Sequence, residues 1–360
     1  MSAWPDRQGG AVTLIGALFI ILPMQFTQPT TRYSMWNMEG SRLPAVGIDY
    51  PGTFEEFDDW FSSEEACLDY VARLRWPDGF CCPNCGNSTD KPWLMRRGLY
   101  LCRKCKRQTS VTAGTLFHRT HKPLRTWFLA IWFVTSQKHG ANALGLQRVL
   151  GLGSYHTAWN WLHKLRRAMV RPGREQLTGS VEVDETYVGG IGKKTRGRGA
   201  KRKSIVAIAA EIRGRGPGRI RLSIIPDVSS ASLHEFVTTH VVPGAEINTD
   251  GWAGYNGLNR LGYEHIVTNI SASGDPAHVV MPRVHLVASL LDRWWLGIHQ
   301  GAIRRSHLAY YLDEFTFRFN RRKSKTRGLL FYRLMEQAVD CAPVSLAIIA
   351  SDRPQHLVAG

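Results

Sequence analysis

The stretch Val181–Tyr187 (VEVDETY) decides the fold of this chain, because apolar and polar residues alternate along it up to an aspartate, Asp184. A second predicted strand, in the stretch Ile247–Trp252 (INTDGW), also closes at an aspartate, Asp250. Such alternation predicts half-buried strands, and we expect each strand to close at its aspartate. A strand-end aspartate alone is a common turn residue. Two of them on neighbouring strands can share a pair of Mg²⁺ ions about 3.5–4 Å apart, the arrangement used for in-line phosphoryl transfer.

The regions around these strands predict an α/β domain with a mixed sheet over residues 179–340. Further strands are expected at 204–212 and 219–225, and helical patterns dominate after about Arg283. Strands followed by helices are typical of a layered α/β domain. Lys193–Lys203 (KKTRGRGAKRK), between the first two strands, is expected to be a mobile basic loop. The last residues, from 341 to 360, are expected to form a tail.

The charge of the chain is unevenly distributed. Its 360 residues contain 46 Lys and Arg against 29 Asp and Glu, which gives a formal net charge of +17. Between Lys91 and Arg174 there are 17 basic residues and no acidic one, so the rest of the chain is balanced at 29 against 29. A hydrophobic fraction of 44% excludes disordered and fibrous architectures. The concentrated charge predicts a nucleic-acid-binding module attached to an electrically balanced body.

Four of the seven cysteines form two C-x₂-C pairs, Cys82 with Cys85 and Cys102 with Cys105. Sixteen residues separate the pairs, a spacing typical of zinc sites in which four thiolates surround one Zn²⁺. Cys81 adjoins Cys82, but only Cys82 gives the two-residue gap. Seven cysteines are too few for a scaffold built on disulfides. The spacing therefore predicts a zinc ribbon.

This ribbon, which we place at residues 79–112, is expected to hold an architectural zinc ion, since a four-thiolate site has no open coordination position. It also carries basic side chains that can contact DNA phosphates. These candidates are Arg96, Arg97, Arg103, Lys104, Lys106 and Arg107.

Residues 113–174 predict a helical DNA-binding region. The aromatic stretch Thr126–Thr135 is expected to pack in a core. After it, a short apolar helix from Ala143, a glycine-containing turn and a second helix form a helix-turn-helix pattern, for which a plain helical hairpin is the alternative. The side chains expected to face the major groove from the second helix are Ser154, Tyr155, His156, Asn160 and Lys164.

The N-terminal segment differs from the rest of the chain. Ala11–Met24 is an apolar run of 14 residues, too short to span a bilayer comfortably. We expect residues 1–37 to be a leader outside the native product, with translation beginning at Met35 or Met38, and an export signal is the alternative. Residues 38–78 are then a small helical lead-in, and no membrane partner is expected.

Several longer stretches resemble one family of mobile-element proteins. They are YPGTFEEFDDWF, the CPNC and CRKC pairs, TAGTLFHRTHKPLRTWFLAIWF, VEVDETYVGG, TDGWAGYNGL and YLDEFTFRFNRR. On these stretches, the chain from about Asp49 to Ala338 resembles insertion-sequence transposases of the ISXO-like family. The resemblance implies an N-terminal zinc ribbon, a helix-turn-helix and a DDE-type catalytic domain of the ribonuclease-H-like fold. It also implies structural Zn²⁺ and catalytic Mg²⁺ or Mn²⁺.

The resemblance also assigns catalytic and metal-binding residues. Asp184 and Asp250 take the first two positions, and the third, usually Glu or Asn, falls on His285. An imidazole can bind a metal ion, but it suits Mg²⁺ less than a carboxylate does. Seven residues further on, Asp292 replaces the family's lysine, so either His285 or Asp292 is expected to complete the metal site.

The family's Glu-x₃-Arg-x₂-Arg helix falls on Glu314, Arg318 and Arg321, whose spacing places them on one helical face. One interpretation is a scaffold that contacts DNA, which adds Arg318 and Arg321 to the DNA-binding candidates. The other is a self-contained network of ion pairs.

The activity that the resemblance implies is that of a DNA transposase. Such a protein binds terminal inverted repeats, cleaves DNA 3′ ends with a divalent metal and transfers the strands to target DNA. It acts as a homo-oligomer on paired ends of double-stranded DNA, in the bacterial cytoplasm at the nucleoid. A zinc-ribbon DNA-binding regulator and a catalytically impaired transposase copy are the alternatives, and His285 and Asp292 favour both.

Overall fold

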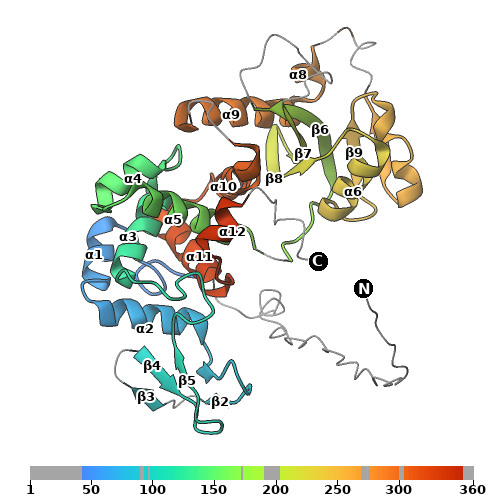
Figure 1. Cartoon of the computed structure of the whole chain (residues 1–360). Coiled ribbons are helices and arrows are strands. Elements are labelled where there is room, and N and C mark those ends of the chain that lie inside the picture. The colour runs from blue at the N-terminus through green and yellow to red at the C-terminus, as the bar shows by residue number, and fades with distance from the viewer. Residues whose placement is uncertain are drawn as a thin grey trace, which may run out of the picture. The chain divides into compact units, whose positions relative to one another are not determined.

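The computed structural model describes most of the chain after residue 42 (Figure 1). The described residues are 43–89, 93–95, 98–171, 173–189, 203–268, 274, 276–299 and 304–351. The predicted leader, Arg96, Arg97 and the basic loop up to residue 202 lie outside them. No helix in the described part of the chain is long and apolar enough to cross a membrane.

Five helices form the N-terminal half of the described chain. They are α1 (Phe54–Trp60), α2 (Glu64–Arg75), α3 (Leu124–Ser136), α4 (Ala143–Leu150) and α5 (Tyr155–Ala168). Four of them start after a residue whose side chain accepts a hydrogen bond from a first-turn N–H, namely Thr53, Ser63, Asn142 and Ser154. Gly151, with a φ of 60°, ends α4 and turns the chain towards α5, as the glycine-containing turn predicts.

Short strands between α2 and α3 form the ribbon. They are β1 (Phe80–Cys81), β2 (Ser88–Thr89), β3 (Trp93–Met95), β4 (Leu99–Leu101) and β5 (Gln108–Ser110). β1 pairs with β2, while β3, β4 and β5 form an antiparallel sheet. At the end of α2, Arg75 donates hydrogen bonds to the carbonyls of Ser110 (3.1 Å) and Val111 (2.6 Å), which ties the ribbon to the helices.

A mixed sheet follows, as the sequence predicts, and it has five strands where the sequence patterns indicate four. Its strands are β6 (Ser180–Val188), β7 (Ser204–Arg213), β8 (Gly216–Ile225), β9 (Glu246–Thr249) and β10 (Glu264–Val267). Their order is β10-β9-β6-β7-β8, in which β6, β7 and β8 are antiparallel while β9 and β10 run parallel to β6. A sheet of this kind is what the expected ribonuclease-H-like fold requires.

One strand is longer than the sequence pattern predicts. β6 does not close at Asp184 but continues to Val188, because its second half pairs with β7 up to Val188 opposite Ser204. Asp184 therefore lies in the middle of β6, opposite Ile208. Asp250, in contrast, directly follows β9, close to where the pattern places the strand end.

Helices cover both faces of the sheet (Figure 1). One face packs against α6 (Ser230–His240) and two short 3₁₀ helices, Ala253–Tyr255 and Leu258–Leu261. The other face packs against α9 (Pro282–His299), which follows the short α8 (Ala277–Val280), and α10 (Leu308–Asn320), which follows the 3₁₀ turn Arg305–His307. Because Asp184 pairs with Ile208, whose side chain belongs to the second core, Asp184 faces α9.

The last described helices pack against the N-terminal helices. α11 (Arg327–Asp340) packs against α2 and α3, and Phe331 and Leu334 lie in the core of the N-terminal helices. The predicted catalytic segment therefore returns to the N-terminal half instead of ending on the sheet. The predicted tail contains α12 (Leu346–Ala350), where Ile349 is buried.

α10 joins the two halves of the described chain. Its Phe315 and Phe319 lie in the core of the sheet, whereas Phe317 lies in the core of the N-terminal helices. Glu314 on α10 accepts a hydrogen bond from Nε of Arg166 on α5 at 2.7 Å, and the two side chains are 1% and 2% exposed. Burial alone would raise the pKa of Glu314, but Arg166 and Arg318 lower it to about 2.

Substitution of Glu314 by Gln is expected to lower the free energy of unfolding by about 3–5 kcal/mol, because it leaves the buried Arg166 without its counter-charge. Urea denaturation followed by tryptophan fluorescence measures the change. Asp58→Asn, which removes an exposed pair with Arg125, is the control and should cost less than about 1 kcal/mol.

The wild-type contribution of Glu314 should also depend on pH. Since its pKa in the folded state is depressed from 4.5 to about 2, the stabilisation is present above pH 4.5 and is lost as the pH falls towards 2. Equal stability of Glu314→Gln and Asp58→Asn at pH 7 would contradict this account of the junction.

Candidate metal centres and nucleic-acid interface

The four predicted zinc ligands converge at two turns of the ribbon. Sγ of Cys82 lies 3.7 Å from that of Cys105, and Sγ of Cys85 lies 3.6 Å from that of Cys102. All four sulfur atoms lie within 4.8 Å of one another, and in the described part of the chain no other group of three or more His, Cys, Asp or Glu does so. Sulfur atoms at the corners of a tetrahedron 2.3 Å from zinc are about 3.8 Å apart, so the cluster fits Zn²⁺.

The two turns have the same hydrogen bonding. The N–H groups of Gly86 and Lys106 donate to the carbonyls of Cys82 and Cys102 at 2.9 Å, and both residues have positive φ values, 68° and 57°. Backbone N–H groups lower the pKa values of the Cys102 and Cys105 thiols, which favours the thiolates that bind zinc. The N–H of Asn87 acts in the same direction on Cys85, but burial and the neighbouring sulfur atoms raise the pKa of that thiol. The hydrogen bonds therefore prepare the turns for the metal.

The described basic candidates of the ribbon lie on its surface. Arg103, Lys104, Lys106 and Arg107 are all exposed. Arg107 donates a hydrogen bond to Oδ1 of Asn84 at 2.9 Å, which links the two turns. Exposed cationic groups on a metal-stabilised turn form a positive surface that can contact phosphates.

On α5, the predicted DNA contacts divide into outward-facing and shielded side chains. Tyr155 and His156, in the first turn, are exposed, while the Ser154 hydroxyl caps the helix by accepting from the N–H of His156 at 3.2 Å. Further along, Asn160 has its Oδ1 shielded from solvent, and burial lowers the pKa of Lys164. Tyr155 and His156 are therefore the exposed members of the predicted set, while Ser154, Asn160 and Lys164 are half-buried.

Asp184 and His285 come together from a strand and a helix. Nε2 of His285, in the first turns of α9, lies 3.8 Å from Oδ2 of Asp184, in the middle of β6. This nitrogen is shielded from solvent and has no hydrogen-bond partner. Burial lowers the pKa of His285, so the imidazole is neutral at neutral pH, which is the form that binds metals. An unpartnered buried nitrogen beside a carboxylate fits a metal site.

Asp250 lies nearby but outside that close contact. Its Oδ1 accepts a hydrogen bond from the N–H of Trp252 at 3.0 Å, which fixes the carboxylate at the end of β9. Its charge acts on both His285 and the buried Tyr255. Tyr255 donates to Oε2 of Glu185 at 3.1 Å, and burial with the surrounding carboxylates raises its pKa. The two aspartates predicted from the sequence therefore lie on neighbouring strands, Asp184 in the middle of β6 and Asp250 just after β9.

The structure also distinguishes His285 from Asp292, the two candidates for the third metal ligand. Asp292 lies on α9 seven residues after His285, so the helical rise of about 1.5 Å per residue puts it about 10 Å further along the axis. Asp292 is exposed there. His285 is thus the α9 side chain that the fold brings to Asp184.

Arg318 and Arg321 are engaged inside the protein. The Arg318 guanidinium donates to Glu314, to the carbonyl of Gln137 and to that of Val134, each at 2.8 Å. The guanidinium of Arg321 lies 4.1 Å from the ring centre of Phe317, and burial lowers its pKa to about 10. The Glu314–Arg318 helix has two interpretations, a scaffold that contacts DNA and an internal network of ion pairs. The contacts of Arg318 are those of the internal network.

Sequence reasoning overlooked one residue next to the acidic site. Glu182 is 2% exposed, and its carboxylate accepts hydrogen bonds from the first N–H groups of α9. The signal was present in the sequence, since Pro282 begins this helix without a Ser, Thr, Asp or Asn just before it.

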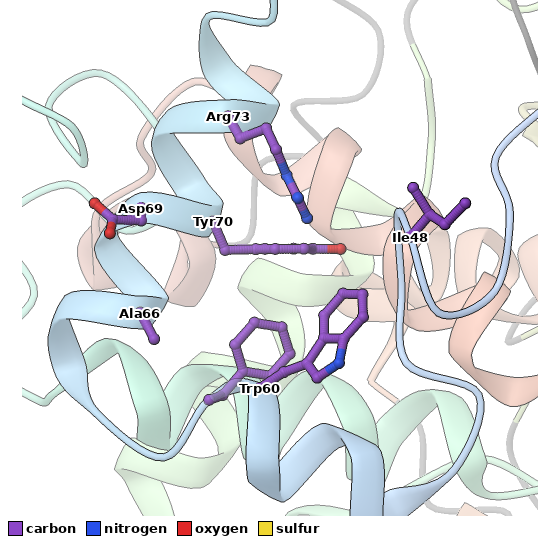
Figure 2. A pocket seen from close by; sticks show the side chains of 7 residues that line it. Ile48, Trp60, Ala66, Asp69, Tyr70 and Arg73 are labelled. Carbon is purple, nitrogen blue, oxygen red and sulfur yellow. The ribbon is translucent and has the colours of Figure 1, made fainter.

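A cavity of about 410 Å³ lies elsewhere, on α1, α2 and the segment before them (Figure 2). It is lined by Ile48, Trp60, Phe61, Ala66, Asp69, Tyr70 and Arg73. The Arg73 guanidinium lies 5.0 Å from the centre of the Tyr70 ring. None of the predicted metal ligands contributes to this cavity.

Comparisons with known proteins identify both domains. Residues 62–108 match a transposase zinc-ribbon domain, and residues 176–320 match an ISXO2-like transposase domain. A protein of Halobacterium salinarum, described as an uncharacterized protein in transposable element ISH50, is 28% identical over 284 residues, which cover 72% of this chain and 91% of the relative.

Two solved structures give weaker matches. The catalytic core domain of BIV integrase is 15% identical, with a TM-score of 0.25, over 38% of this chain and 82% of its own. A chain of the simian T-cell lymphotropic virus intasome in complex with PP2A regulatory subunit B56 gamma is 16% identical, with a TM-score of 0.27, over 52% of this chain and 65% of its own.

Replacing Cys82 by Ser is expected to remove zinc from the protein, because three thiolates no longer complete the tetrahedron. The zinc content of purified protein after dialysis against a chelator measures this, and about one ion per chain is expected for the wild type. Cys81→Ser is the matched control, since Cys81 is exposed and lies outside the cluster. Loss of zinc from Cys81→Ser with retention by Cys82→Ser would reverse the assignment.

Proposed function

We propose that this chain, an ISXO2-like insertion-sequence transposase by its two matched domains, binds the terminal inverted repeats of its element and catalyses metal-dependent 3′-end cleavage and strand transfer. The observation that carries the proposal is the approach of His285 Nε2 to Asp184 Oδ2 at 3.8 Å, beside Asp250. These groups come from three separate segments, and their donor atoms are the types that bind divalent cations.

Asp184, Asp250 and His285 are the side chains that would hold the catalytic metal, Mg²⁺ or Mn²⁺. Divalent ions bound there supply charge stabilisation for an in-line displacement at phosphorus. The protein's own part is to orient the ligands: the Trp252 N–H fixes Asp250, and the pairing of β6 with β7 fixes Asp184 opposite Ile208. His285 stays neutral because of its burial, and it adds a donor atom without adding charge.

DNA would be bound by parts of the chain other than the metal ligands Asp184, Asp250 and His285. The exposed cations of the ribbon and the exposed first turn of α5 supply phosphate and groove contacts, and they lie in the stretch that contains no acidic residue. Zn²⁺ would hold the ribbon turns in place without taking part in the reaction, since its four thiolates leave no open position. Action on two paired ends of double-stranded DNA requires a homo-oligomer.

A second candidate is a DNA-binding regulator, or a transposase copy of impaired activity. The observation that favours it is His285 itself, because a neutral imidazole is a poorer ligand for Mg²⁺ than a carboxylate. Both candidates bind DNA through the same ribbon and helices. They differ in cleavage, which a regulator does not perform.

Asp184→Asn and Asp250→Asn are each expected to lower the rate of strand transfer by about 1,000-fold or more, since loss of a metal ligand removes several kcal/mol of charge stabilisation. Binding of the element's end should stay unchanged. A strand-transfer assay with Mn²⁺ and an electrophoretic mobility shift assay measure the two properties. Asp292→Asn is the control and should keep its activity; survival of strand transfer in either of the first two variants shows that the metal assignment is wrong.

His285→Glu is expected to shift the metal preference of the reaction towards Mg²⁺, because it replaces an imidazole by a carboxylate. The measurement is the ratio of the rates in Mg²⁺ and in Mn²⁺, which should rise about tenfold over the wild-type ratio. Leu286→Ala, which changes an exposed neighbour on the same helix, should leave the ratio unchanged. An unchanged ratio in His285→Glu would exclude His285 from the metal site.

A further inference from the structure

α9 lacks a capping residue of its own. The first N–H groups of a helix have no partner within the helix and usually bond to the side chain of the residue just before it. α9 begins at Pro282, which has no N–H, and Met281 before it has no side-chain oxygen. The N–H groups of Arg283 and Val284 therefore need an acceptor from elsewhere in the chain.

Glu182 supplies that acceptor from the sheet. One carboxylate oxygen, Oε2, accepts from the N–H of Arg283 at 2.7 Å and from that of Val284 at 2.9 Å. The other, Oε1, accepts from Nη1 of Arg283 at 3.2 Å, while Nη2 of Arg283 donates to the carbonyl of Gly214 at 2.9 Å. The carboxylate is 2% exposed, and a negative charge at this end of the helix is favoured by the helix dipole.

These contacts connect the two segments that carry the metal ligands. Glu182 precedes Asp184 by two residues on β6, so the two side chains share one face of the strand. Val284, held by Glu182, directly precedes His285. Because both residues lie in the first turn of α9, the regular helix geometry makes the position of the His285 backbone depend on that of Val284.

We propose that Glu182 is a positioning residue, whose carboxylate holds the start of α9 on β6 and thereby sets the distance between His285 and Asp184. The inference rests on the proposed function, because it concerns the same metal site. The hydrogen bonds of Glu182 go to the start of α9, so it positions His285 through the helix backbone, and its charge also acts on the His285 ring. Loss of the Glu182 charge should let the start of α9 move. The affinity of Asp184 and His285 for a shared cation should then fall.

The chain offers two matched controls. Glu64 performs the same task at α3, which begins after Pro123 without a side-chain cap: its carboxylate oxygens accept from the N–H groups of Leu124 at 2.7 Å and Arg125 at 3.2 Å. Glu211, on β7, is an equally buried carboxylate that accepts from the N–H and guanidinium of Arg219. Neither bonds to α9.

The test measures the affinity of the zinc-loaded full chain for Mn²⁺ by isothermal titration calorimetry, in the wild type and in Glu182→Gln, Glu64→Gln and Glu211→Gln. Glu182→Gln keeps one acceptor oxygen for the N–H groups of α9, which favours folding, and it removes the charge together with the oxygen that accepts from Nη1 of Arg283. We expect its Kd for Mn²⁺ to rise about tenfold, the scale of effects from groups that orient metal ligands. The two control variants should stay within about twofold of the wild type, although all three lose stability.

A kinetic measurement adds a second readout. At saturating DNA, the strand-transfer rate of Glu182→Gln should fall at low Mn²⁺ and return towards the wild-type rate as Mn²⁺ is raised, with unchanged DNA affinity. A wild-type Mn²⁺ affinity in folded Glu182→Gln, or equal losses in all three variants, overturns the inference and leaves Glu182 a structural cap. If Asp184→Asn binds Mn²⁺ as tightly as the wild type, the proposed function itself fails.

Discussion

The buried contact between Arg166 and Glu314 is the constraint on which the arrangement of the described chain depends. It joins α5, the second helix of the predicted DNA-binding pair, to α10, which packs on the sheet. A buried charge without its partner costs several kcal/mol, so neither helix can leave the other without a large penalty. Because α10 also contributes Phe317 to the helical core, the two halves share a helix as well as an ion pair.

This junction separates two kinds of chemistry that have opposite electrostatic needs. The surfaces that grip DNA require an excess of positive charge, which the chain concentrates between Lys91 and Arg174. A site for divalent cations requires carboxylates, which DNA phosphates repel. The chain keeps its predicted metal ligands on the sheet and on α9, outside the basic stretch, and connects both through α10.

The sequence predicts best those features whose cause is local. Cysteine spacing identified the sulfur cluster, since two residues between thiolates suffice to form each turn. Alternation along β6 and β9 identified the mixed sheet but not the length of β6, which depends on pairing with β7 as far as Val188. The packing of α11 against α2 and α3, and the engagement of Arg318 with carbonyls at the end of α3, depend on contacts between distant segments that no periodicity encodes.

In the candidate metal site, too, some residues can be recognised from local sequence patterns and others only from contacts between distant segments. Asp184 and Asp250 could be singled out by their strands, and His285 only by the family resemblance. The role of Glu182 emerges only when the missing cap of α9 is compared with the partners of its N–H groups. A helix that begins at a proline without a capping residue is therefore a signal worth following in other sequences.

The activity proposed for the chain is cleavage of DNA at the ends of its own element. The most direct measurement is a nicking assay with the zinc-loaded full chain and Mn²⁺, on a duplex that carries the element's end and on a scrambled duplex of the same length. We expect a nick at the element's 3′ end in the first duplex and none in the second. Binding of the end without cleavage, or equal cleavage of both duplexes, would contradict the proposal.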